Sequence, residues 1–178
     1  GQISQFTLTG NFSENEINVS TKNCKGLALV AGGTSTSKSV TCTIGAVGTG
    51  VVSLEAKLAD GTVLKSVSFD VPNPQVSMQT SLGAVVLELN PTAAPLSTDN
   101  FLQYVNSKFY DNTLIHRVVT TGIFVAQGGW LTPTPAVQPG QKAAIALEVN
   151  KGLSNLKGTI AMARSADLNS ATSQYYFN

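Results

Sequence analysis

The chain has 178 residues, and only 12% of them are charged, with 11 basic and 10 acidic residues that leave a formal net charge of +1. This length fits one or two domains, and the charged fraction is about half that of a typical soluble domain. The sequence contains no cluster of lysine and arginine, which argues against a nucleic-acid partner. It also contains no apolar run near the ~20 residues that a membrane-spanning helix needs, so no transmembrane segment is expected.

Residues 1–71 alternate between short apolar stretches and turns, a pattern that predicts β-strands. In the clearest of them, residues 51–58, every second side chain is apolar, as in a half-buried strand. The pair Asp60-Gly61 predicts a two-residue hairpin turn into the next strand, residues 63–71. Several short strands without a helical period predict a small β-sandwich of immunoglobulin-like type. We find no functional constellation in it and interpret it as a spacer or adhesion module.

The two cysteines of the chain, Cys24 and Cys42, both lie in this first part. We expect a disulfide between them, because the surrounding composition is typical of secreted proteins, although buried free cysteines are also common. The bridge would stabilise the domain by about 3 kcal/mol. The first residues, GQISQFTLTG, do not form a signal peptide, and we expect that one was removed from a periplasmic or secreted protein.

A proline-rich linker, residues 72–74, separates residues 1–71 from a second domain, residues 75–178. Each proline fixes its own φ and favours an extended conformation in the residue before it, so the linker is expected to be short and stiff. The second domain opens with a predicted hairpin, residues 75–80 and 84–90. A helix follows, for which Ser97 or Thr98 is the expected N-cap and which is expected to end near Ser107. Beyond residue 130 we expect an irregular proline-rich loop over 130–140 and strands within 158–164 and 173–178.

The stretch 114–130, LIHRVVTTGIFVAQGGW, predicts two short strands joined by a tight connection. It is expected to place Arg117, Phe124 and Gln127 on one sheet face, a surface suited to a peptide. Arginine is always charged and only donates hydrogen bonds, so in a dry pocket Arg117 can donate to a prolyl nitrogen but cannot act as a base. Such a donation localises the lone pair of the nitrogen and eases rotation of the X-Pro bond. Taken alone, Arg117 is more simply an ordinary solvated arginine of a strand.

Four motifs in order, IHRV, FVAQGGW, GTIAMARSAD and SATSQYYFN, resemble those of the cyclophilins, the peptidyl-prolyl cis-trans isomerases. The resemblance runs from about Gln75 to the last residue. It implies a mainly β fold, a cyclophilin-like β-barrel with one helix, that follows the immunoglobulin-like sandwich. It further implies isomerisation of X-Pro bonds in extracytoplasmic proteins, with proline-containing polypeptides as partners and no cofactor or metal.

The resemblance assigns the catalytic role to Arg117, which would donate to the prolyl nitrogen in an apolar pocket. Phe124 and Tyr176 would form walls of that pocket, and the two glutamines would bind the peptide backbone. The substrate-binding residues implied in this way are Phe124, Val125, Gln127, Ala163, Gln174 and Tyr176.

Three features depart from the family pattern. The segment TTGI looks like a two-residue insertion between Arg117 and Gln127, and Val125 stands where methionine is usual. The chain also ends at Asn178, about a third of the family domain early, so we expect a barrel truncated before closure and a weakly active or inactive 178-residue chain. The alternative hypothesis is a non-catalytic cyclophilin-like structural or assembly protein, whose open barrel edge is completed by another chain or by self-association.

The central stretch contains two further aromatic residues that are candidates for a site, His116 and Trp130. His116 is the only histidine, and on a strand its side chain is expected to point away from the face of Arg117, so we predict a structural role and no Ser-His-Asp chemistry. Trp130, the only tryptophan, fits a ligand platform or a packing role equally well.

Overall fold

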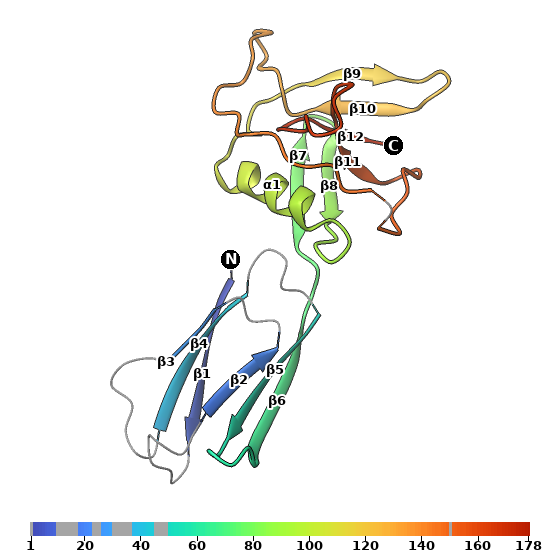
Figure 1. The fold of residues 1–178 in the computed structure, drawn as a ribbon. Helices are drawn as coiled ribbons and strands as arrows, with labels where there is room; N and C mark the ends of the chain where they lie inside the picture. Colours follow the sequence, from blue (N-terminus) through green and yellow to red (C-terminus); the bar gives the residue numbers. More distant parts are fainter. Residues whose placement is uncertain (1, 10–17, 23–25, 30–36, 45–49, 150) are drawn as a thin grey trace. The chain divides into compact units, whose positions relative to one another are not determined.

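The computed structural model describes residues 2–9, 18–22, 26–29, 37–44, 50–149 and 151–178. The chain divides into two compact units, Gly1–Pro74 and Gln75–Asn178. The described residues are mainly β with one helix (Figure 1), as the sequence predicted. No helix among them has the length and apolar character needed to cross a membrane.

The first unit contains two antiparallel three-stranded sheets. One has the order β1 (Gln2–Thr9), β4 (Ser37–Ile44), β3 (Gly26–Leu29), and the other the order β2 (Asn18–Lys22), β5 (Gly50–Lys57), β6 (Val63–Val71). The immunoglobulin-like assignment of this unit stays a prediction. So does the disulfide, because Cys24 and the side chain of Cys42 lie outside the described residues.

Strand β5 confirms the predicted alternation, since Val52, Leu54 and Ala56 are buried. The predicted two-residue turn after it was wrong. Leu58 N donates to Thr62 O (2.9 Å) and Gly61 N to Leu58 O (3.0 Å), so three residues lie between Leu58 and Thr62. Gly61 is the last residue of this loop and has a φ of +89°, a conformation that L side chains rarely adopt, which explains a glycine at this position.

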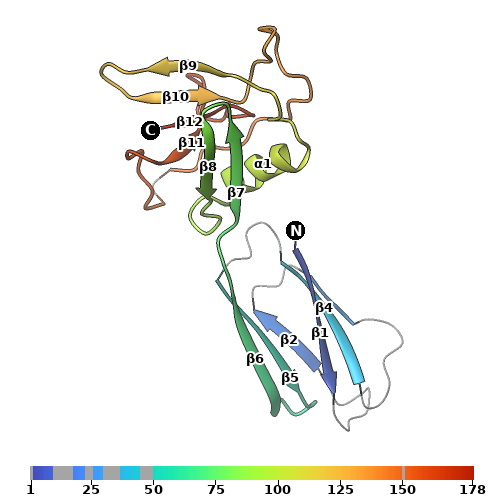
Figure 2. The ribbon, with the colours of Figure 1, turned by 180° about the vertical axis from the view of Figure 1, so that it is seen from behind.

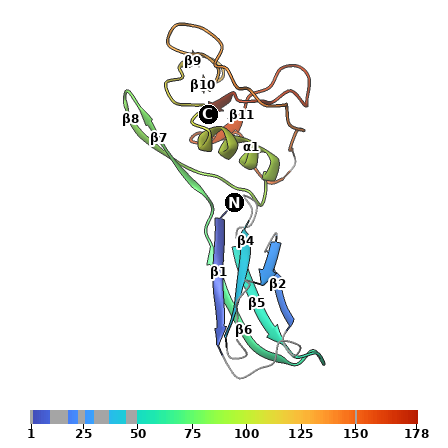
Figure 3. The same cartoon turned by 90° about the vertical axis from the view of Figure 1, so that its left-hand side faces the viewer.

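The second unit has two sheets. Strands β7 (Gln75–Thr80) and β8 (Gly83–Glu88) form a hairpin, which Figure 3 shows as a ribbon of its own. The other sheet is antiparallel with the order β11 (Ile160–Met162), β12 (Tyr175–Phe177), β10 (Val125–Gly128), β9 (Ile115–Val119). The described strands of this unit form no closed barrel.

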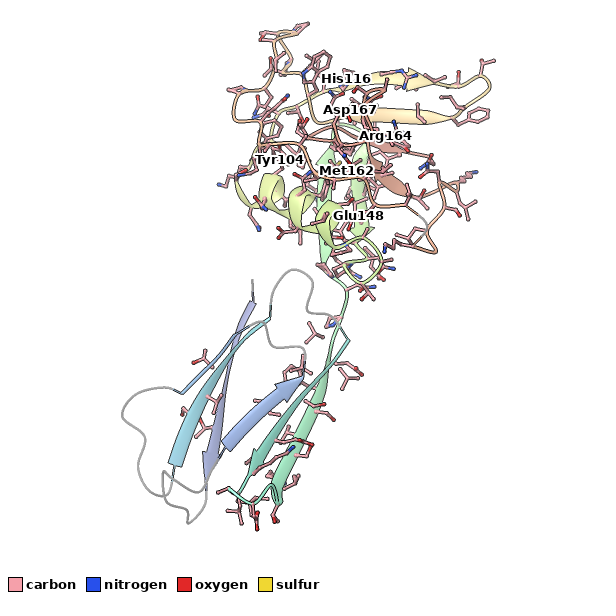
Figure 4. The ribbon with its side chains drawn as sticks, in the orientation of Figure 1. Tyr104, His116, Glu148, Met162, Arg164 and Asp167 are labelled. Carbon is pink, nitrogen blue, oxygen red and sulfur yellow. The ribbon has the colours of Figure 1, made fainter. Side chains whose placement is uncertain are left out.

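Helix α1 (Pro95–Asn106) starts earlier than the sequence predicted, with Ala94 rather than Ser97 or Thr98 at the N-cap. Proline suits the first helical position because its fixed φ is helical and its missing N–H needs no partner there. The free N–H groups of Leu96 and Ser97 donate instead to the carboxylate of Glu148, at 2.9 and 2.7 Å. Figure 4 labels Glu148 near α1. The predicted end near Ser107 is confirmed, since Ser107 is the C-cap.

The core of the second unit joins three elements that are far apart in the sequence. Leu87 of β8, Phe101 of α1 and Tyr175 of β12 are buried together. The ring of Tyr175 meets that of Phe101 edge-on with centroids 5.7 Å apart, and that of Tyr110 at 5.3 Å. The β7–β8 hairpin and α1 therefore pack against the face of the four-stranded sheet to which Tyr175 projects.

Ionisation of Tyr175 is expected to destabilise this core at alkaline pH. Burial raises the pKa of its phenol to about 12, from an ordinary value of 10.0, and burial also raises the pKa of Tyr110. The folded state thus holds the phenolic proton more tightly than the unfolded state, so the stabilisation is complete below pH 10 and is lost as the pH rises toward 12.

We expect the free energy of unfolding to fall between pH 8 and pH 11, with about 1 kcal/mol of that fall due to Tyr175. Urea titrations of the natural protein and of the Tyr175→Phe variant at both pH values measure this difference. An identical pH dependence in the two proteins would show that Tyr175 ionises as freely in the folded state as in the unfolded chain.

Candidate functional site

Four side chains lie in a row across the four-stranded sheet. Arg117 of β9 is opposite Gln127 of β10, Gln127 is opposite Tyr176 of β12, and Tyr176 is opposite Ala161 of β11. Directly opposite residues of an antiparallel pair project to the same face of the sheet. The sheet register therefore places Arg117, Gln127 and Tyr176 on one face.

Hydrogen bonds fix the polar groups on this face. Arg117 Nη1 donates to Gln127 Oε1 (3.1 Å), and Gln127 Nε2 donates to Gln174 Oε1 (2.8 Å). Ala163 lies beside this chain of bonds, because its backbone N donates to Gln174 O at 2.8 Å. Arg117 is exposed, and in the described part of the chain it forms no salt bridge. Its other N–H groups are available to an acceptor on a bound molecule.

Tyr176 has a partner that no sequence motif predicted. Its phenolic oxygen accepts a hydrogen bond from Asn155 Nδ2 at 3.0 Å. Asn155 belongs to an irregular stretch without a recognisable motif and reaches Tyr176 from 21 residues away. This bond holds the phenol at the end of the ring, which leaves the ring faces for apolar contact.

The glycine pair after Gln127 allows a close approach of strands. A Cβ atom on Gly128 would lie 2.8 Å from Ile115 Cδ1, and one on Gly129 would lie 2.7 Å from Ser173 O. Ser173 Oγ also donates to Gly129 O at 2.7 Å. The two glycines thus allow β10 to pack closely against its neighbours, and this packing fixes the position of Gln127 in the sheet.

The connection between β9 and β10 is longer than the predicted tight turn. It runs over residues 120–124, and Ile123 N donates to Thr121 O (3.1 Å) across Gly122, whose φ is +81°. An i to i+2 bond of this kind is a γ-turn. The connection takes up the extra residues of the TTGI segment, so Arg117 and Gln127 remain opposite each other.

Phe124 lies in this connection rather than in a strand, and its side chain is 67% exposed. The expectation that it shares the strand face of Arg117 and Gln127 was therefore wrong, because β10 begins only at Val125. Val125 is half-buried opposite Val119, on the face of Arg117. The roles of Phe124 and Val125 in a proline pocket stay predictions.

His116 and Trp130 contact each other. Their rings meet edge-on with centroids 5.5 Å apart, and His116 Nδ1 is buried without a hydrogen-bond partner among the described residues. This contact supports a packing role for both. In the same described residues no three His, Cys, Asp or Glu side chains gather to hold a metal ion.

Comparison with known proteins matches residues 75–178 to the cyclophilin type peptidyl-prolyl cis-trans isomerase/CLD family. The chain is 46% identical to the peptidyl-prolyl cis-trans isomerase cyp18 of Streptomyces antibioticus over 103 residues. This aligned stretch covers 58% of this chain and 60% of that protein. It is 42% identical over 106 residues to a peptidyl-prolyl cis-trans isomerase of Acinetobacter baylyi, covering 60% and 55%. It is 40% identical over 103 residues to peptidyl-prolyl cis-trans isomerase B of Escherichia coli, covering 58% and 61%. The matched region thus spans between about half and three fifths of these curated relatives.

Proposed function

The chain belongs to the cyclophilin-type peptidyl-prolyl cis-trans isomerase family through residues 75–178, and from this membership we propose that the natural protein isomerises X-Pro bonds of polypeptides. The observation that carries the proposal is the chain of side-chain hydrogen bonds that joins Arg117 to Gln127 and Gln127 to Gln174. It combines one permanent cation with two amides that can bind a peptide backbone.

In the proposed mechanism Arg117 donates a hydrogen bond to the prolyl nitrogen. The nitrogen lone pair then no longer conjugates with the preceding carbonyl, so the bond loses double-bond character and its rotation barrier falls from ~18–20 kcal/mol. Arg117 keeps its proton throughout, because its guanidinium has no accessible neutral form. Gln127 holds the guanidinium in place by accepting from Nη1, and Gln174 holds Gln127 in turn.

The remaining site residues would shape the substrate pocket. Tyr176 offers a ring face beside Gln127, and Val125 offers an apolar side chain on the same face. Ala163, next to Gln174, leaves room for the substrate residue that precedes the proline. A hydrogen bond from a charged donor contributes only about 1.5 to 3 kcal/mol. The proposal therefore assigns the rest of the rate acceleration to an apolar pocket that holds the proline while the acyl side turns.

Peptide exchange in the natural protein tests this function. An X-Pro bond interconverts unaided in tens to hundreds of seconds, so a four-residue peptide with one Ala-Pro bond shows no exchange between its cis and trans NMR signals on a subsecond timescale. We expect exchange cross-peaks when the natural protein is added at a catalytic concentration. Their absence at saturating peptide would rule out the isomerase proposal.

A non-catalytic assembly role is the second candidate, and the open sheet favours it. Strands β9 and β11 are the edges of their sheet in the described part of the chain, and such edges can pair with a strand from another chain. The peptide experiment separates the two candidates, because an assembly protein leaves the exchange rate unchanged.

We also propose an extracytoplasmic location and, for the first unit, a spacer or adhesion role. The immunoglobulin-like sandwich and the Cys24–Cys42 bridge belong to this proposal, and the low charged fraction of 12% supports it.

A further inference from the structure

The connection between β9 and β10 carries an exposed apolar pair, Ile123 and Phe124, here called the hairpin tip. Their side chains are 58% and 67% exposed, and no other described ring packs against Phe124. In Figures 1 and 2 the turn projects beyond the strands β11 and β12 of the same sheet. Two large apolar side chains are thus presented to solvent at the free end of the hairpin.

The backbone of the hairpin tip forms a hydrogen-bonded turn. The hydrogen bond from Ile123 N to Thr121 O closes the γ-turn, and Gly122 provides the positive φ that this turn requires. Every residue from Thr120 to Phe124 is uncharged. An uncharged and apolar surface binds apolar side chains by burying apolar area and offers nothing to a charged group.

The hairpin tip continues the proposed active-site face. The pair Val119 and Val125 lies between it and the pair Arg117 and Gln127. With a rise of about 3.3 Å per strand residue, the tip begins about 7 to 10 Å from Arg117. An extended polypeptide whose proline lies at Arg117 covers that distance with two to four residues.

We propose that Ile123 of the hairpin tip is a second substrate contact, which binds an apolar side chain located two to four residues from the proline. The inference rests on the proposed isomerase function and specifies its substrate class. Unfolded polypeptides expose apolar side chains next to their prolines, whereas folded proteins bury them. The preferred substrates are therefore unfolded chains with an apolar residue near the proline.

Two matched twelve-residue peptides test the proposal with the natural protein. Both carry the same central Ala-Pro bond, and they differ only in having leucine or serine at the positions two to four residues from the proline on both sides. We expect the leucine peptide to show about fivefold lower KM, at similar kcat, and about fivefold tighter binding by fluorescence anisotropy.

The variant Ile123→Ser identifies the contact. Ile123 is changed rather than Phe124, because Phe124 is also expected to line the proline pocket. We expect Ile123→Ser to remove the preference for the leucine peptide and to leave kcat/KM for the serine peptide unchanged. The control is Leu153→Ser, since Leu153 is 56% exposed in the same unit and is expected to keep the preference.

The outcomes separate this inference from the function on which it rests. Equal KM and equal affinity for the two peptides, or a preference that persists in Ile123→Ser, overturns the hairpin-tip contact. If neither peptide is isomerised but the leucine peptide still binds more tightly in an Ile123-dependent manner, the contact stands and the isomerase proposal fails.

Discussion

Replacing Arg117 by alanine in the natural protein is expected to lower kcat/KM for an X-Pro peptide by about 10- to 150-fold. The variant loses one hydrogen bond from a charged donor, worth about 1.5 to 3 kcal/mol, and each 1.36 kcal/mol corresponds to a factor of ten in rate. The apolar pocket remains, so residual isomerisation above the uncatalysed rate is expected. NMR exchange with the four-residue peptide measures the change.

The chain provides a matched control, because Arg164 is its only other arginine. Arg164 is also exposed, but its Nη1 donates to the backbone oxygen of Ser165 (2.9 Å) and not to Gln127 or Gln174. We expect Arg164→Ala to keep the parent rate. Arg117→Lys is expected to lie between the parent and Arg117→Ala, since lysine keeps the charge but not the planar group that meets Gln127. Equal losses at Arg117 and Arg164 would argue for a general effect of charge and against the proposed donation.

Replacing Gly129 by alanine is expected to reduce the free energy of unfolding of the second unit by about 2 to 5 kcal/mol. A positive φ costs an L residue roughly 1 to 2 kcal/mol, and overpacking adds about 1 to 3 kcal/mol. The overlap is severe, because the new Cβ would lie 2.7 Å from Ser173 O and 3.0 Å from both Tyr110 Cε1 and Tyr175 Cδ1. A loss of this size is a large part of the roughly 5 to 15 kcal/mol that stabilises a typical domain.

Gly122→Ala separates the two causes of that loss. Gly122 has the same φ of +81° as Gly129, but nothing lies within 4 Å of the position of its Cβ. Urea titrations followed by fluorescence should therefore show only about 1 to 2 kcal/mol for Gly122→Ala. If both variants lose the same amount, the close approach at Gly129 contributes nothing to stability.

The parts of the fold that depend on local sequence could be predicted. The alternation in residues 51–58 depends only on neighbouring residues, and β5 follows it. The central stretch forms the two predicted strands, and the register places Gln127 opposite Arg117. The ordered motifs also pointed to the family that the comparison finds.

The errors arise where a distant residue or a backbone conformation decides the outcome. The start of α1 depends on Glu148, whose carboxylate no local pattern around Ser97 reveals. The position of Phe124 depends on a γ-turn at Gly122 that moved it out of β10. The bond from Asn155 to Tyr176 arises only when the folded chain brings the two together.

The Glu148 carboxylate also sets an order of events during biosynthesis. Glu148 follows Leu96 by 52 residues, and ribosomes add about 5 to 20 residues per second. The first turn of α1 is therefore synthesised about 3 to 10 s before its anionic partner. Over that interval the N–H groups of Leu96 and Ser97 lack the carboxylate to which they donate in the folded chain.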